Sequence, residues 1–217
     1  ALENICVPKQ ATDLKNFKRE SVIHIEIDRI SDESQQALVS KNLQSVLTDV
    51  ERAVSDWSLM RDKILEVKAQ AAKAPANIDE RERKEILTFL QWIHDDHLTL
   101  LGYREYALQE VDSNLELHAL APSGLGILRC EDAESLSLSF AALPPEIRTL
   151  ATSRDLLITN KSNSRATVHR PGYLDYIGVK KYNSCGKVIG EHRFLGLYTT
   201  SAFNTPPKDI PYLRLKV

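Results

Sequence analysis

The sequence predicts an α+β protein in which an N-terminal strand and a long helix precede an antiparallel sheet of about five strands with flanking helices. Three observations indicate this class. Residues 20–30 alternate apolar and polar side chains, residues 31–73 contain neither glycine nor proline, and residues 97–200 hold several strand-like segments joined by turns. Because helical crossovers do not regularly separate these later segments, a doubly wound nucleotide-binding fold is disfavoured.

The composition is that of an ordinary globular protein, with 42% hydrophobic and 27% charged residues among 217. No window approaches the roughly 20 apolar residues that cross a bilayer, and the first residues lack the pattern of a secretory signal. We therefore expect a cytoplasmic protein without membrane partners. The three widely spaced cysteines, Cys6, Cys130 and Cys185, are expected to be reduced thiols. A single methionine, Met60, and an end at Val217 within an apolar stretch indicate a piece of a longer protein.

Charge is distributed unevenly along the chain. Residues 160–217 carry ten lysines and arginines against three acidic residues, giving +7, whereas the preceding 159 residues carry −9. The two parts should attract each other. The basic residues are spread singly through expected strands rather than clustered with stacking aromatics, so nucleic acid is not an expected partner.

The N-terminal region is expected to form strands followed by one long helix. The alternating apolar residues of the main strand are Ile23, Ile25 and Ile27. Residues 6–7 are a weaker candidate for its partner strand. A cap at Ser31 or Asp32 opens a helix that continues to Lys73, because Pro75 stops it.

The long helix carries a heptad seam of apolar residues. At alternating spacings of three and four they are Leu43, Val46, Val50, Ala53, Trp57, Met60, Ile64, Val67 and Ala71. Over residues 43–57 a wide apolar stripe favours packing on a sheet, whereas beyond that range the narrow seam favours a helix partner, within the chain or across a dimer. We predict a dimer through residues 20–71. The candidate self-association residues are Trp57, Met60, Ile64 and Val67.

A linker at residues 74–77 separates two predicted domains, residues 1–74 and 79–217. Asp79 and Glu82 resemble a capping box, and the helix that they open reaches about Asp96. Its expected buried residues are Ile86, Leu90 and Ile93, with Phe89 at their side.

Antiparallel strands follow this helix. We expect them at residues 97–108, 115–120, 155–161, 166–170, 173–182 and 187–200. Turns at residues 112–114 and 183–186 join neighbouring strands. Short helices are expected at residues 131–138 and 144–152, between the second and third strands.

No motif in the sequence carries recognisable catalytic chemistry. Gly124-Leu125-Gly126 begins like a dinucleotide fingerprint, but Arg129 replaces the third glycine and no helix is expected there, so no cofactor site is predicted. His94 and His97 could reach one metal ion, yet no further ligand is predicted, and a surface helix end is the favoured interpretation. A nucleophile elbow and a phosphate-binding loop are both missing.

One group of polar residues on the later strands is a candidate for effector binding or interdomain contact. Its members are His169, Arg170, Asp175, Tyr176, Lys180, Glu191 and Arg193. Arg170 could clamp a carboxylate bidentately while His169 orients it. The favoured alternative is a cross-strand ladder of charge pairs, each contributing a fraction of a kcal/mol.

Five longer stretches of the chain carry a family resemblance. They are residues 89–106 (FLQWIHDDHLTLLGYREY), 124–129 (GLGILR), 167–179 (TVHRPGYLDYIGV), 190–200 (GEHRFLGLYTT) and 210–214 (IPYLR). In this order they resemble the N-terminal region of the large bacterial NAD-specific glutamate dehydrogenases. The similarity covers most of residues 20–217, although Leu98 and Leu100 stand where phenylalanines are expected.

The resemblance implies the end of an ACT-like domain followed by a PAS-like domain, ahead of a C-terminal catalytic domain that oxidatively deaminates L-glutamate to 2-oxoglutarate with NAD. Neither the nucleotide fingerprint nor the substrate lysines of that domain are expected in this piece. We therefore expect a non-catalytic regulatory and assembly segment whose partners are its own chain's other domains and further subunits. The alternative is a PAS-like or ACT-like sensor that encloses an amino acid or another small effector. An independent hydrolase using His169, or His94 with His97, is the least favoured function.

Overall fold

The computed structural model describes residues 23–75, 78–111, 114–129 and 155–217. Residues 1–40 and 41–217 form two compact units, whereas the sequence predicted a boundary between residues 74 and 79. The expected strand at residues 6–7, part of the turn at 112–114 and the expected helices at 131–138 and 144–152 lie outside the described residues.

In the first unit the predicted strand is wrong for its described part. Residues 23–30 belong to no strand, and the side chains of Ile23, Ile25 and Ile27 are 75%, 70% and 65% exposed. A strand needs a neighbour that pairs with its backbone and covers its apolar face, and alternation alone supplies neither. Helix α1 (Glu33–Ser55) starts after Asp32, which caps it: Asp32 Oδ1 accepts a hydrogen bond from the Ser34 backbone N at 2.9 Å.

The long helix is divided at Asp56 into α1 and α2 (Trp57–Ala72), which corrects the prediction of one helix to Lys73. At Asp56 the backbone departs from regular helical angles, with φ −94° and ψ 0°. The Asp56 carboxylate accepts a hydrogen bond from the Gly126 backbone N at 2.8 Å and pairs with Arg129. These contacts bury Asp56 and tie the helix break to the segment around residue 126.

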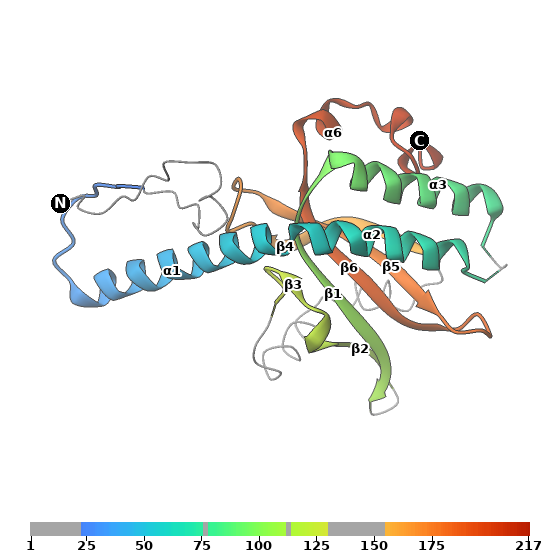
Figure 1. Cartoon of the computed structure of the whole chain (residues 1–217), viewed down its shortest axis with the longest axis horizontal. Coiled ribbons are helices and arrows are strands. Elements are labelled where there is room, and N and C mark those ends of the chain that lie inside the picture. The colour runs from blue at the N-terminus through green and yellow to red at the C-terminus, as the bar shows by residue number, and fades with distance from the viewer. Residues whose placement is uncertain (1–22, 76–77, 112–113, 130–154) are drawn as a thin grey trace, which may run out of the picture. The chain divides into compact units, whose positions relative to one another are not determined.

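The second half of the apolar seam packs within its own chain. Met60, Ile64 and Val67 have no exposed surface, and α2 lies beside α3 (Glu80–Trp92) over the sheet (Figure 1). Because their side chains fill the internal core, these three residues are unavailable to a partner chain, which corrects their assignment to self-association. Trp57 is different, since 43% of it is exposed. The helix partner indicated by the narrow seam is α3.

Helix α3 begins at the predicted cap. Asp79 accepts a hydrogen bond from the Glu82 backbone N at 3.0 Å. Arg83 donates to the carbonyl oxygens of Ala72 and Pro75 at 3.4 and 3.1 Å, so the segment that leaves α2 is held against α3. A π-helical turn, Ile93–His97, then leads into the sheet.

The described strands form a single antiparallel sheet. Their bounds are β1 Leu98–Val111, β2 Asn114–Ala119, β3 Leu125–Gly126, β4 Leu157–Arg165, β5 Tyr173–Tyr182 and β6 Val188–Tyr198. The hydrogen-bonded order is β2-β1-β6-β5-β4, and β3 pairs with β1. The α+β class is confirmed, and the sheet is consistent with a PAS-like form.

The predicted strand at residues 166–170 is wrong. These residues form a bend between β4 and β5, and His169 has φ 72°, far from the extended region that a strand requires. After β6 the chain forms α6 (Thr200–Asn204) and two short 3-10 turns, Pro207–Asp209 and Leu213–Leu215, none of which was predicted.

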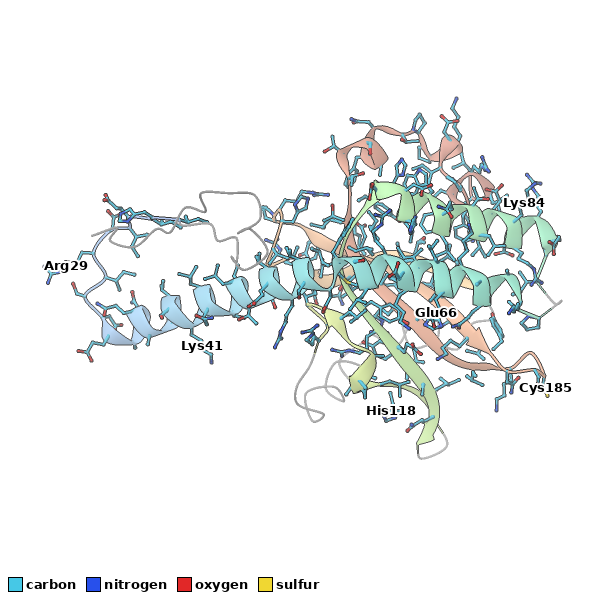
Figure 2. The ribbon with its side chains drawn as sticks, in the orientation of Figure 1. Arg29, Lys41, Glu66, Lys84, His118 and Cys185 are labelled. Atoms are coloured by element: carbon cyan, nitrogen blue, oxygen red, sulfur yellow. The ribbon has the colours of Figure 1, made fainter. Side chains whose placement is uncertain are left out.

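The main core lies between α2, α3 and one face of the sheet. Its fully buried side chains include Met60, Ile64, Ile86, Phe89, Leu90, Tyr103, Ile177 and Phe194. The predicted burial of the α3 residues is thus confirmed. At the surface, Glu66 on α2 and Lys84 on α3 are exposed, as is Cys185 in the turn between β5 and β6 (Figure 2). No helix in the described part of the chain is long and apolar enough to span a membrane.

Candidate functional site

The seven polar residues that the sequence singled out do not form one site. Those on one face of the neighbouring strands β5 and β6 are Tyr176, Lys180, Glu191 and Arg193. The other three, His169, Arg170 and Asp175, lie elsewhere. Strand geometry explains the separation of Asp175 from Tyr176, because successive side chains of a strand point to opposite faces.

Glu191 is the centre of a buried ionic cluster. Its Oε2 accepts a hydrogen bond from Lys180 Nζ at 2.8 Å, and neither side chain has exposed surface. Tyr176 Oη donates to Oε1 of the same carboxylate, and a guanidinium nitrogen of Arg193 lies 3.4 Å from that oxygen. The sheet register produces this meeting, since Lys180 on β5 stands directly opposite Glu191 on β6.

Two tyrosine rings hold the Arg193 guanidinium. Its central carbon lies 3.8 Å from the centre of the Tyr106 ring and 5.0 Å from that of Tyr176, as in cation–π contacts. Tyr106 stands opposite Glu191 on β1, so three adjacent strands contribute to the cluster. Tyr106 was not among the residues predicted for this site, because nothing local in the sequence indicates that β1 and β6 are neighbours.

The charges of the cluster control the protonation of its members. Burial by itself would raise the pKa of Glu191, but the positive charges of Arg193 and Lys180 outweigh burial and hold this pKa below its ordinary value. Burial raises the pKa of Tyr176 well above its ordinary value. At neutral pH the carboxylate is therefore ionised and the phenol protonated, and neither is poised to exchange a proton in catalysis.

Gly178 makes room for this cluster on β5, between Tyr176 and Lys180. A Cβ atom at this position would lie 2.8 Å from Tyr176 Oη and 3.0 Å from Glu191 Cδ. Replacing Gly178 by alanine is expected to displace the partly buried Tyr176 and lower the free energy of unfolding by about 1–3 kcal/mol, measured by urea denaturation. Gly172→Ala is the matched control, because a Cβ there would meet no atom closer than 3.7 Å. Equal losses in the two variants would contradict this account.

The opposite face of the same strands carries a second polar network. His192 on β6 faces α2, where its Nε2 lies 2.9 Å from Gln70 Oε1. Its Nδ1 lies 2.8 Å from Tyr103 Oη, which donates to Glu105 Oε1 at 3.1 Å. Lys181 Nζ donates to Glu105 Oε2 at 2.7 Å. No sequence pattern predicts this network, because only the tertiary fold brings α2 onto these strands.

Burial lowers the pKa of His192 to about 4, from an ordinary value of 6.5. The unfolded chain therefore takes up this proton at a higher pH than the folded chain. The contribution of neutral His192 to stability is fully present above pH 6.5 and is lost as the pH falls towards 4. Acidification to about pH 4 should lower the free energy of unfolding of the unmodified chain by up to about 3 kcal/mol more than that of the His192→Gln variant, measured by urea unfolding. The same acid sensitivity in both proteins would rule out this histidine as the cause.

The remaining polar candidates hold the end of β6 and the neighbouring bend. Asp175 accepts a hydrogen bond from the Tyr198 backbone N at 3.1 Å and pairs with Lys161. Arg170 donates to the Tyr198 carbonyl oxygen at 2.9 Å, which uses part of the guanidinium that could otherwise clamp a carboxylate ligand. Effector binding or interdomain contact by these residues stays a prediction.

The two histidines of the His-x-x-His motif are engaged separately. His97 Nδ1 lies 2.8 Å from the Trp92 carbonyl oxygen, and its ring stacks on the indole of Trp92. His94 Nδ1 lies 3.2 Å from Asp95 Oδ1. No group of three or more potential metal ligands occurs among the described residues. Residues 124–126 form the end of a 3-10 turn and β3, and no described helix opens at these glycines.

An apolar cavity of about 380 Å³ lies where the junction of α1 and α2, the start of β1 and the bend before β5 meet. It is lined by Val50, Ala53, Val54, Trp57, Thr99, Leu100, Leu101, Val168 and His169. Its volume is within the range of about 300–1,000 Å³ that is usual for small-molecule sites. Two residues from the sequence-based predictions, Trp57 and His169, thus meet at one place, although they were assigned to different roles.

Known proteins with similar sequences align with the whole chain. It is 35% identical over 217 residues to the NAD-specific glutamate dehydrogenase of Halomonas elongata. The aligned region covers 100% of this chain and 13% of that relative. The chain corresponds to the N-terminal region of the NAD-specific glutamate dehydrogenases. The enzyme of this name from Pseudomonas aeruginosa is 33% identical over 205 residues, or 94% of this chain and 12% of the relative.

A third NAD-specific glutamate dehydrogenase, from Mycobacterium tuberculosis, is 25% identical over 200 residues, or 91% of this chain and 11% of the relative. No family model matches the chain. The resemblance found in the sequence motifs is confirmed, and the chain spans only between 11% and 13% of the glutamate dehydrogenases that it matches.

Proposed function

We propose that this chain is a non-catalytic regulatory and assembly segment of a cytoplasmic NAD-specific glutamate dehydrogenase. A C-terminal domain outside the chain would oxidatively deaminate L-glutamate to 2-oxoglutarate with NAD as cofactor. The similarity to the Halomonas elongata enzyme carries this proposal, because it extends over 100% of the chain but only 13% of that enzyme. The missing phosphate-binding loop and the internal pairing around Glu191 also support it.

The experiment compares the longer protein with this chain in an assay of glutamate-dependent NAD reduction. Activity is expected in the longer protein only. Calorimetric titration of this chain with NAD should show no stoichiometric binding, because a dinucleotide needs the glycine loop and helix N-terminus that the sequence lacks. A stoichiometric micromolar NAD site, or turnover of glutamate by the chain alone, would overturn the non-catalytic assignment.

An exposed apolar stripe in the second unit supports the assembly role. With spacings of four and three it consists of Leu43, Leu47, Val50, Val54 and Trp57, which are 41–72% exposed. This is the spacing of a helix that packs against another helix. The intervals between these residues are nearly the same when counted from either end of the stripe. Two antiparallel helices that cross at Val50 would therefore place Leu43 against Trp57 of the partner subunit. We therefore propose a second copy of the chain as its partner.

Replacing Leu43 and Leu47 together by glutamate is expected to convert a dimer into a monomer. Each half-exposed side chain of the stripe would contribute roughly 1 kcal/mol on burial, so association should be weak and is best measured by sedimentation at high micromolar concentration. Leu59→Glu is the control, because Leu59 is 53% exposed but lies off the stripe. If the unmodified chain is monomeric at this concentration, the proposed self-association is wrong.

A second candidate function, a small-ligand sensor, is favoured by the apolar cavity at the α1–α2 junction. A ligand there would contact the helix break and the sheet together. It could therefore shift any equilibrium in which these elements move, provided that it binds one arrangement better. In the longer protein, ligand-dependent glutamate oxidation that is lost on filling the cavity would support this function, and an unchanged response would refute it.

A further inference from the structure

Three segments far apart in the sequence build the walls of the apolar cavity. The α1–α2 junction contributes Val50, Ala53, Val54 and Trp57, the start of β1 contributes Thr99, Leu100 and Leu101, and the bend before β5 contributes Val168 and His169. None of these residues carries a permanent charge. The lining therefore favours a hydrocarbon or aromatic body and disfavours a dicarboxylate such as glutamate, for which these residues offer no permanent positive charge.

Hydrogen bonds hold these walls apart and in place. Thr167 Oγ1 donates to Asp49 Oδ2 at 2.8 Å, which ties the bend before β5 to α1. On the other side, the buried Asp56 carboxylate accepts from the Gly126 backbone, and β3 pairs with β1 next to Leu101. These contacts connect the three walls of the cavity, which lowers the ordering that is needed before a ligand binds.

Trp57 and His169 give the cavity its two specific features. The Trp57 ring is held by the Arg61 guanidinium, 4.8 Å from the ring centre, and Arg61 in turn donates to the His94 carbonyl oxygen at 3.2 Å. Among the described residues, His169 is one of three non-glycine residues with a positive φ, at 72°. Such strained residues occur often at ligand contacts, and the imidazole is the only ionisable side chain among the described residues of the lining.

We propose that this cavity binds a small ring-containing molecule whose apolar body lies against Trp57 and whose single polar head group meets His169. The head group can be a carboxylate or a hydroxyl, since an imidazole can donate to either. Binding at this cavity does not depend on the proposed sensor function, but a regulatory effect of that binding does. Binding is measured on this chain, so a missing site and a missing response in the longer protein are distinguishable failures.

The experiment uses 19F NMR of the chain labelled with fluorotryptophan, because it has only two tryptophans. Trp92→Phe assigns the two signals. Phenylacetate and phenylethanol serve as probes with the two head groups, and glutamate serves as the polar control. The titration is also made on the Leu43→Glu, Leu47→Glu background, in which association cannot cover the cavity.

At least one aromatic probe is expected to shift the Trp57 signal and leave that of Trp92 in place, with a dissociation constant of about 1 mM or lower. Glutamate is expected to shift neither signal. If both aromatic probes leave Trp57 unmoved up to about 10 mM, or if glutamate binds as well as they do, the proposed site is wrong.

Variants locate the binding within the cavity. Ala53→Leu fills the space and should weaken binding at least tenfold, whereas Ala69→Leu, on an exposed position of α2, should have no effect. If Ala53→Leu does not fold, Val54→Asp replaces it in the test. Val54 is 72% exposed, so this variant is expected to fold, and its charge in the lining should also weaken binding about tenfold. His169→Gly removes the head-group contact at a φ that glycine adopts freely. Unchanged phenylacetate and phenylethanol affinities in this variant would overturn the role of His169.

Discussion

Replacing Glu191 by glutamine is expected to lower the free energy of unfolding by about 3–5 kcal/mol, measured by guanidinium denaturation. Glutamine has nearly the same shape, so the loss would come from charge rather than from a cavity. Lys180 is fully buried against this carboxylate, and Arg193 lies between two tyrosine rings beside it. Removing the negative charge leaves the buried Lys180 and the partly buried Arg193 without their central counter-ion.

Glu80→Gln is the control for this substitution, because Glu80 pairs with Arg83 on the same helix but is itself 87% exposed. It should change stability by less than about 1 kcal/mol. The pKa of Glu191 lies below its ordinary value, so the contribution of the carboxylate is present above that value and is lost as the pH falls through the folded-state pKa. The difference between the unmodified chain and Glu191→Gln should therefore shrink in acid. A loss of less than 1 kcal/mol at neutral pH would show that the cluster contributes little to stability.

Replacing Ile64 by alanine is expected to lower the free energy of unfolding by about 2–5 kcal/mol. Ile64 on α2 has no exposed surface and belongs to the core between the two helices and the sheet. The truncated side chain would leave a void that its packed neighbours can fill only in part. Since this core lies within one chain, the loss should be the same at every protein concentration.

Trp57→Ala is the comparison that separates the two halves of the apolar seam. Trp57 is 43% exposed, so the unfolding free energy should fall by less than in Ile64→Ala. Self-association should respond in the opposite order, with Trp57→Ala weakening it more. The structure would be contradicted if the stability of the unmodified chain rose with protein concentration and that of Ile64→Ala did not. Such a result would place Ile64 at an intermolecular contact.

Local sequence patterns were sufficient for much of the second unit. The start of α3 follows from Asp79, whose carboxylate satisfies a backbone N–H three residues later. The strands β1, β5 and β6 and the burial of Ile86 and Leu90 follow from apolar periodicity. These features depend on residues a few positions apart, and such residues interact whatever the rest of the chain does. The resemblance to the glutamate dehydrogenases likewise came from the sequence motifs.

Other features depend on residues that meet only in the folded chain. The alternating isoleucines at 23–27 describe a strand that has no partner among the described residues, and the helix break at Asp56 depends on a carboxylate that binds Gly126. Periodicity indicates which side chains share a face, but it cannot indicate what covers that face. The tertiary structure alone therefore decided that Glu191 lies in an ionic cluster, that its neighbour His192 faces α2, and that Trp57 and His169 line one cavity. Burial and cross-strand register are set by contacts between distant segments, and no local pattern contains them.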